Sequence, residues 1–185
     1  NTPIGEATAC GGDSMIRSDA FKSVGGYRSA LIAGEEPELC LRLRELGWKV
    51  WRLDAEMTRH DAAITRVSQW WRRTVRSGYA YAEIARLHKN SKLRIYAQEA
   101  KRAIVWGGLL PLAIGVGTLV HPTAVLAILI YPAQICRIAM RQSGDKSTSW
   151  AYALFIVIAK FAELLGLLKF QLRRLSGRAG QLIEY

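Results

Sequence analysis

The residues best suited to acid–base chemistry are three carboxylates, Glu35, Glu36 and Glu38, which cluster where a helix is expected to begin. Pro37 suits the first turn of a helix, because its missing N–H needs no partner there. A carboxylate at such a corner can accept the proton of an incoming hydroxyl group. Acidic side chains are also common at helix starts, where the helix dipole favours them. The cluster by itself therefore fits either a general base or an ordinary helix start.

The elements around this cluster can be predicted from local patterns. The sequence predicts a short strand over residues 14–17, a helix beginning at Ser18 or Asp19, a helix over 37–46, and a strand over 49–53. Ser and Asp are favoured helix N-caps, Gly47 is a typical C-terminal stop, and alternation of apolar and polar residues indicates the strand. Residues 1–64 are thus expected to form a mixed α/β unit.

Residues 65–102 are predicted to be helical, basic and aromatic. Trp70 and Trp71 lie among four arginines, Arg66, Arg72, Arg73 and Arg76. A basic helix with aromatic residues is typical of the membrane interface. A solvated or domain-packing helix is the alternative.

Residues 103–170 are expected to be membrane helices, followed by a basic tail over 171–185. The runs Ala103–Val120 and Thr123–Cys136 contain no charged residue, and a spanning helix needs about 20 apolar residues. A third apolar stretch, Trp150–Leu168, carries Lys160 and Glu163, which are spaced to pair on a helix. It is predicted to span, to lie tilted against the others, or to lie in the interface. A buried pair of core helices is the remaining alternative.

The charge distribution supports the membrane interpretation. The net charge of +11 divides into −1 over residues 1–60, +7 over 61–102 and +5 over 103–185. Basic clusters flank the apolar runs, which indicates that the flanks lie on the cytoplasmic side of a membrane. The first two runs then form a hairpin with its tip at His121 and Pro122. A nucleic-acid partner is not expected, because the charge-free runs do not fit a soluble basic protein.

Three widely spaced cysteines provide no disulfide framework, so a reducing compartment is expected. The chain begins with Asn1 rather than Met, and it has no Asp-x-Asp motif and no glycine-rich phosphate loop. We therefore expect a fragment, or a processed or trimmed chain.

Several motifs in series resemble the C-terminal half of the catalytic domain of inverting family 2 glycosyltransferases. They are the small-residue turn and strand at 11–17, the Phe–Gly–Gly–Tyr segment at 21–27, the acidic helix start at 35–36, and residues 42–50. The resemblance covers about residues 5–80, and it implies that this chain is a fragment that lacks the nucleotide-binding half of the fold and is inactive alone. It implies part of a GT-A, Rossmann-like α/β fold, a nucleotide-sugar donor and a divalent metal, Mg²⁺ or Mn²⁺.

Carried over to this sequence, the resemblance places Glu36 at the position of the catalytic base and Glu35 just before it. The family usually has Glu-Asp where this chain has Glu-Glu-Pro, so the carboxylate of Glu36 reaches one methylene further. His60 falls where some relatives complete the metal site, and a structural loop histidine is the alternative. Asp61 is suited to orient its ring.

The same resemblance suggests substrate-binding residues. Residues 66–73 are similar to the Gln/Arg-x-x-Arg-Trp motif of processive members, which implies that Gln69, Trp70, Arg72 and Arg73 contact sugar or pyrophosphate. Trp71 is better explained as an anchor at the headgroups. Gly11, Gly12 and Asp13 are expected to form the floor of the site, since a bare backbone allows close approach of a sugar.

These observations together predict a bacterial plasma-membrane glycosyltransferase with its catalytic part in the cytoplasm. The expected reaction is inverting hexosyl transfer to a lipid-linked saccharide or a growing exopolysaccharide. The alternative from a different class is a non-catalytic membrane-bound assembly subunit. The departure at Glu35–Glu36–Pro37 favours that alternative.

Overall fold

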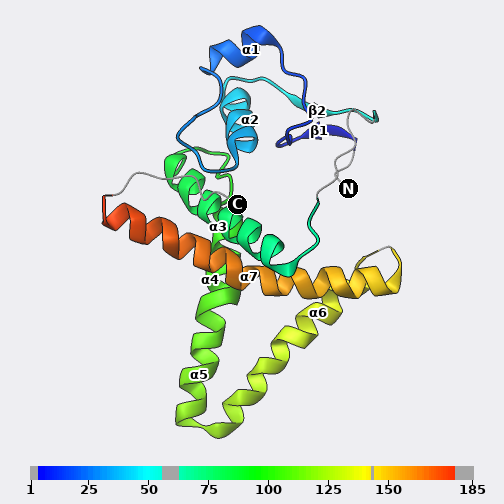
Figure 1. The fold of residues 1–185 in the computed structure, drawn as a ribbon, viewed down its shortest axis with the longest axis vertical. Helices are drawn as coiled ribbons and strands as arrows, with labels where there is room; N and C mark the ends of the chain where they lie inside the picture. The colour runs from blue at the N-terminus through cyan, green and yellow to red at the C-terminus, as the bar shows by residue number, and fades with distance from the viewer. Residues whose placement is uncertain (1–3, 56–62, 143, 178–185) are drawn as a thin grey trace.

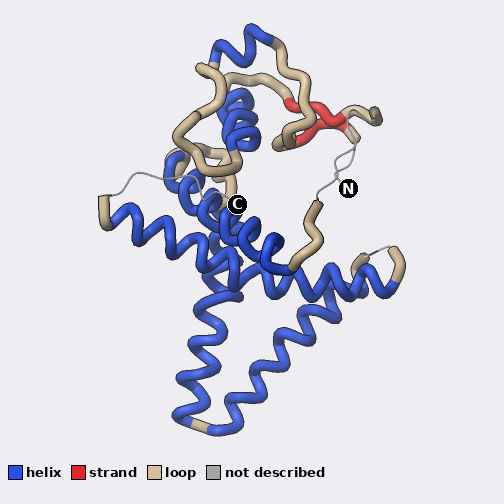
Figure 2. The backbone as a smooth tube through the Cα atoms, viewed as in Figure 1, coloured by secondary structure: helices blue, strands red, loops and turns tan. Residues whose placement is uncertain are grey.

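The computed structural model describes residues 4–55, 63–142 and 144–177. The chain is mostly helical, and its only sheet among these residues has two strands (Figure 2). The mixed α/β region lies at one end, and a pair of long apolar helices extends from the other (Figure 1). The Rossmann-like half-domain expected from the sequence is not seen, because the described residues contain no parallel sheet.

The sheet pairs β1 (Gly5–Ala7) with β2 (Val50–Arg52) in antiparallel register, with Glu6 opposite Trp51. The strand predicted over 49–53 is confirmed in its central residues. The strand predicted over 14–17 is wrong, because this segment has no ladder partner in the described part of the chain. The glycines before it make a turn, and Met15 is left exposed.

Two helices follow, α1 (Ser18–Ser23) and α2 (Glu35–Glu45), and both were expected from the sequence. The N-cap of α1 is Arg17, which makes no side-chain cap hydrogen bond, so the predicted capping by Ser18 or Asp19 is wrong. Asp19 lies in the first turn, where its carboxylate accepts a hydrogen bond from the N–H of Ala20. Leu39 and Leu43 of α2 are buried against Ala20 of α1. This small apolar core fixes α2, and thereby the acidic helix start, relative to the rest of the α/β region.

The longest polar helix is α3 (Val67–Leu87), and it is followed by α4 (Ala97–Ile104). Tyr79 and Ala82 of α3 are buried in a second apolar cluster with Ile32, Ala103 and Phe170. This cluster joins the α/β region to the apolar helices below it.

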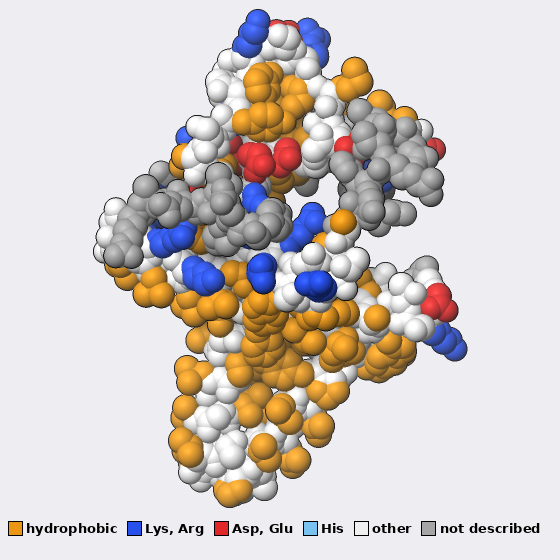
Figure 3. Space-filling view, viewed as in Figure 1, with side chains coloured by type: hydrophobic (Ala, Val, Ile, Leu, Met, Phe, Trp, Pro, Cys, Tyr) orange, Lys and Arg blue, Asp and Glu red, His pale blue; other side chains and the backbone are white. Residues whose placement is uncertain are grey.

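The predicted hairpin is present. Its first arm is α4, a π-helical turn η1 (Val105–Leu109) and α5 (Leu110–Val120), and its second is a 3-10 helix η2 (Pro122–Leu129) and α6 (Ile130–Met140). Both arms are long and apolar enough to cross a membrane. A 3-10 helix rises about 2.0 Å per residue rather than 1.5 Å, so η2 lengthens the shorter charge-free run toward membrane thickness. Figure 3 shows hydrophobic side chains spread over much of the visible surface of this part.

The last helix, α7 (Lys146–Leu175), runs across the top of the hairpin instead of alongside it (Figure 1). Its N-cap Asp145 accepts a hydrogen bond from the N–H of Thr148. Two glycine contacts fix its place. Gly166 lies against the backbone of α3 at Gly78, and Gly107 of η1 lies against the backbone of α7 at Lys160.

Candidate functional site

The acidic corner, by which we mean Glu35 and Glu36 at the start of α2, packs against α3 through Gly34. This residue precedes α2 with a positive φ of 81°, and a β-carbon there would lie 2.7 Å from Cδ1 of Ile84. Glycine suits this position because other residues are strained at this φ, and a side chain there would also displace the tip of Ile84. Glu35 and Glu36 follow directly and are half-buried. The corner is therefore a fixed feature, positioned by α2 and α3 together.

Glu36 lies beside the glycine turn, as the sequence interpretation requires. Its Oε1 is 3.8 Å from the position that a β-carbon would occupy on Gly12. Gly11, Gly12 and Asp13 are all exposed. The structure thus brings Glu36 together with the predicted floor residue Gly12, although these positions are separated by 24 residues in sequence.

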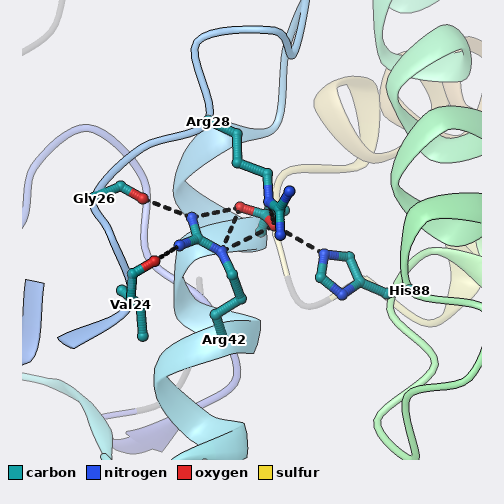
Figure 4. A network of polar contacts seen from close by, with 6 residues as sticks. Val24, Gly26, Arg28, Arg42 and His88 are labelled. Carbon is teal, nitrogen blue, oxygen red and sulfur yellow. Dashed lines mark hydrogen bonds and ion pairs between the residues drawn. The ribbon is translucent and has the colours of Figure 1, made fainter.

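The third carboxylate, Glu38, has a structural role. Its side chain is fully buried and accepts hydrogen bonds from Arg28 (2.7 Å), Arg42 (2.7 Å) and His88 (2.8 Å). Arg42 also donates to the carbonyl oxygens of Val24 and Gly26 (Figure 4). Burial raises the pKa of Glu38, but the hydrogen bonds from Arg42 and His88 and the nearby positive charges lower it below its ordinary value.

This network connects three segments. Arg28 and the two carbonyls belong to the loop after α1, Glu38 and Arg42 to α2, and His88 to the end of α3. Because all three segments meet at one buried carboxylate, the network fixes α2 at a point two residues beyond Glu36.

Two cysteines lie behind the acidic corner. The sulfur atoms of Cys10 and Cys40 are 3.3 Å apart, and both residues are free thiols. The hydrogen bond from Cys40 lowers the pKa of Cys10 to about 6, against the opposing effects of burial and the charge of Glu36. The pKa of Cys40 is raised, because it donates that hydrogen bond and is buried. The spacing of the two cysteines gave no sign of this pair.

Two tyrosines near the corner were also missed by sequence reasoning. Burial and the charges of neighbouring carboxylates raise the pKa of Tyr96 to about 12, and Glu35 and Glu36 are among those carboxylates. Burial also raises the pKa of Tyr27, and the charges of Cys10 and Glu36 add to the effect. The Gly–Gly–Tyr segment was the available signal for Tyr27. Tyr96 is 60 residues from Glu36 and carries no local signal.

The predicted residues on α3 lie near its start. The side-chain oxygen of Gln69 accepts hydrogen bonds from the N–H groups of Thr65 and Arg66, both at 3.0 Å, so Gln69 caps the helix. The ring of Trp70 packs edge-on against Phe155 of α7, with centroids 4.8 Å apart. Arg72 and Arg73 are exposed, and Figure 3 shows a row of Lys and Arg side chains at the upper border of the hydrophobic surface.

A cavity of about 630 Å³ adjoins the glycine turn. Gly11 and Asp13 line one side, and Trp48 and Trp51 line another. Glu36 lies outside its wall. The volume is in the range of ligand pockets, but the cavity is separate from the acidic corner.

A metal site is not assembled by the described residues, since no three His, Cys, Asp or Glu side chains among them are grouped to hold an ion. His60 and its neighbour Asp61 lie outside the described residues. The divalent metal expected from the resemblance therefore stays a prediction.

Comparisons of the chain with protein-family models, with curated proteins and with solved structures found no match.

Proposed function

We propose that this chain is the acceptor-side and membrane part of a glycosyltransferase, and that the whole enzyme transfers a hexosyl unit, with inversion, from a nucleotide-sugar to a hydroxyl group. The acceptor is a lipid-linked saccharide or a growing polysaccharide. The observation that carries the proposal is the position of Glu36 beside Gly12. The Oε1 atom of Glu36 lies 3.8 Å from the position that a β-carbon would occupy on Gly12. A carboxylate beside an exposed, side-chain-free turn is what a general base for a bulky hydroxyl acceptor needs.

In the proposed reaction, Glu36 accepts the proton of the acceptor hydroxyl as its oxygen bonds to the anomeric carbon. The bond between that carbon and the nucleoside diphosphate breaks, and the diphosphate leaves. Glu35 adds negative charge beside the base, and Gly11, Gly12 and Asp13 form the floor.

The leaving diphosphate would be bound by arginine. Arg72 and Arg73 are exposed on α3, the helix on which the acidic corner is packed. A guanidinium group matches phosphate oxygens in two-point geometry. The three candidate membrane helices support action at a bilayer, and the basic flanks favour a cytoplasmic site. The bacterial plasma membrane enters the proposal through the resemblance.

The experiment is a transfer assay in membranes that carry the protein as the cell makes it. A panel of radiolabelled nucleotide hexoses is supplied, and label is followed into the lipid and polysaccharide fractions. Glu36→Gln keeps the shape of the side chain but removes the base. General-base catalysis typically contributes 10²–10⁴-fold, so transfer should fall by about that factor.

Glu45→Gln is the matched control, because Glu45 is exposed at the other end of the same helix. It should leave transfer unchanged. Full transfer by the Glu36→Gln variant contradicts the assignment of the base.

The second candidate is a non-catalytic membrane-bound assembly subunit. It is favoured by one observation, that Glu36 does not line the cavity beside the glycine turn. This function predicts no transfer from any donor in the panel. It also predicts that cells with the wild-type protein and cells with the Glu36→Gln variant produce the same amount of polysaccharide.

A further inference from the structure

The placement of α7 decides how many times this chain crosses the membrane. By length and composition α7 is one of three helices able to span, and the other two are the arms of the hairpin. A third crossing would put the two ends of α7 on opposite sides. Its contacts with α3 argue against that arrangement.

Helix α3 packs along α7 over a long stretch. Ring pairs mark both ends of this stretch, Trp70 with Phe155 at 4.8 Å and Tyr79 with Phe170 at 5.3 Å. Between them Gly166 meets the backbone of α3. If α7 crossed the hydrocarbon layer, the paired part of α3 would have to enter it as well.

That part of α3 carries three arginines. Arg72 and Arg73 are exposed, and Arg76 donates to the carbonyl oxygen of Ile32 in the α/β region. An arginine in the middle of a bilayer costs at least about 2.5 kcal/mol on insertion scales. The two exposed arginines, and the hydrogen bond from Arg76 to the α/β region, therefore keep α3 and the helix α7 packed on it out of the hydrocarbon centre.

The two sides of α7 differ in the way expected for an interfacial helix. The side packed on α3 and the hairpin is buried at Ala159, Ala162, Gly166 and Phe170. The opposite side carries an exposed apolar stripe with spacings of three, four and seven residues: Leu154, Phe161, Leu165, Leu168, Leu172 and Leu175. A stripe at these spacings follows one face of a helix.

We infer that α7 lies in the plane of the membrane, with this stripe facing the acyl chains and α3 above it on the aqueous side. The chain then crosses the bilayer twice, through α4–η1–α5 and η2–α6. The tip at His121 and Pro122 lies on the far side. Every basic cluster, including Lys169, Arg173 and Arg174 near the end of α7, then faces the headgroups of one leaflet.

Depth measurements on spin-labelled cysteines test the inference in lipid nanodiscs. Leu154→Cys and Leu172→Cys are exposed positions separated by 18 residues, which is five helical turns on the same face. If α7 lies in the membrane plane, the spin labels at both positions should lie at the same depth in the bilayer. A spanning α7 separates them by about 27 Å along the membrane normal.

The matched control is the first hairpin arm. Leu109 and Leu119 are exposed, and labels there should differ in depth by about 15 Å because this arm crosses the membrane. Equal depths in the arm overturn the two-crossing arrangement.

Sidedness gives an independent readout in sealed vesicles. Ser147→Cys and Ser176→Cys lie at the two ends of α7 and are both exposed. An impermeant maleimide should label both from one side, and Thr123→Cys at the hairpin tip from the other. Labelling of the two α7 ends from opposite sides overturns the inference, and so does labelling of the tip from the α7 side.

Discussion

Gly78 of α3 and Gly166 of α7 pack backbone against backbone. A β-carbon on Gly78 would overlap the carbonyl of Glu163, and one on Gly166 would overlap the carbonyl of Val75. The contact brings a basic polar helix and an apolar helix closer than any side chain allows. It therefore determines where α3, and the acidic corner packed on it, sits relative to the membrane.

Alanine at Gly78 or Gly166 should destabilise the protein, because the overlap is with backbone that cannot rotate away. Overpacking of this kind costs about 1–3 kcal/mol or more. The thermal midpoint of purified protein in detergent is the measurement. Gly115→Ala on α5 is the control, since its β-carbon would meet nothing within 4 Å. Equal midpoints for Gly166→Ala and Gly115→Ala contradict the close contact.

Removal of the Glu38 charge should destabilise the α/β region. Glu38→Gln leaves Arg42, whose side chain is only 12% exposed, without its carboxylate. Loss of one partner from a buried pair costs about 3–5 kcal/mol, and the exposure of Arg28 places the expected effect at the lower end. Asp19→Asn, which breaks the exposed pair with Arg17, should leave the unfolding midpoint unchanged.

The stability contributed by Glu38 should depend on pH with a defined sign. The pKa of Glu38 is lowered from its ordinary value of 4.5, so the unfolded chain binds a proton more readily than the folded one. The contribution is fully present above 4.5 and is lost as the pH falls through the lower, folded pKa. Unfolding midpoints measured from pH 7 to pH 3 should therefore converge for wild type and Glu38→Gln. If the unfolding midpoints of wild type and Glu38→Gln differ by the same amount over this whole pH range, the lowered pKa of Glu38 is contradicted.

Cys10 should react as a thiolate at neutral pH. Its pKa of about 6 predicts that the rate of alkylation by iodoacetamide rises with pH with a midpoint near pH 6. The reaction is measured by mass spectrometry in a Cys136→Ser background. Cys40→Ala removes the hydrogen bond that lowers this pKa and should move the midpoint toward the ordinary value of 9.0. Cys10→Ser should abolish the modification. A wild-type midpoint above 8 would contradict the thiol pair.

The hairpin should resist extraction from membranes by alkaline carbonate. Leu112→Arg places a charge on an exposed position inside the first charge-free run. A charged side chain at the centre of a membrane helix costs about 2.5–3.5 kcal/mol on insertion scales, so this substitution should lower the fraction of protein that inserts. Leu46→Arg, at an exposed position after α2, should have no effect on insertion. Release of wild-type protein into the carbonate supernatant would show that the hairpin is not integral.

Local patterns in the sequence determined the helices and the apolar hairpin. The leucines and the acidic start of α2, the glycine after it, and the charge-free runs each act within a few residues. The predicted bounds at 37–46 agree with α2 to within two residues, and the predicted start at residue 65 lies two residues before α3. The membrane helices were predictable for the same reason, since a long run without charge has few other stable environments.

Only the tertiary structure decided which of these residues meet. The three carboxylates look alike in sequence, yet Glu38 is buried among Arg28, Arg42 and His88, whereas Glu36 lies beside Gly12. Those partners are up to 50 residues away, and only packing brings them together. The thiol pair and the crossing of α7 at Gly166 are likewise long-range contacts. They depend on how close two backbones can approach, which no local periodicity encodes.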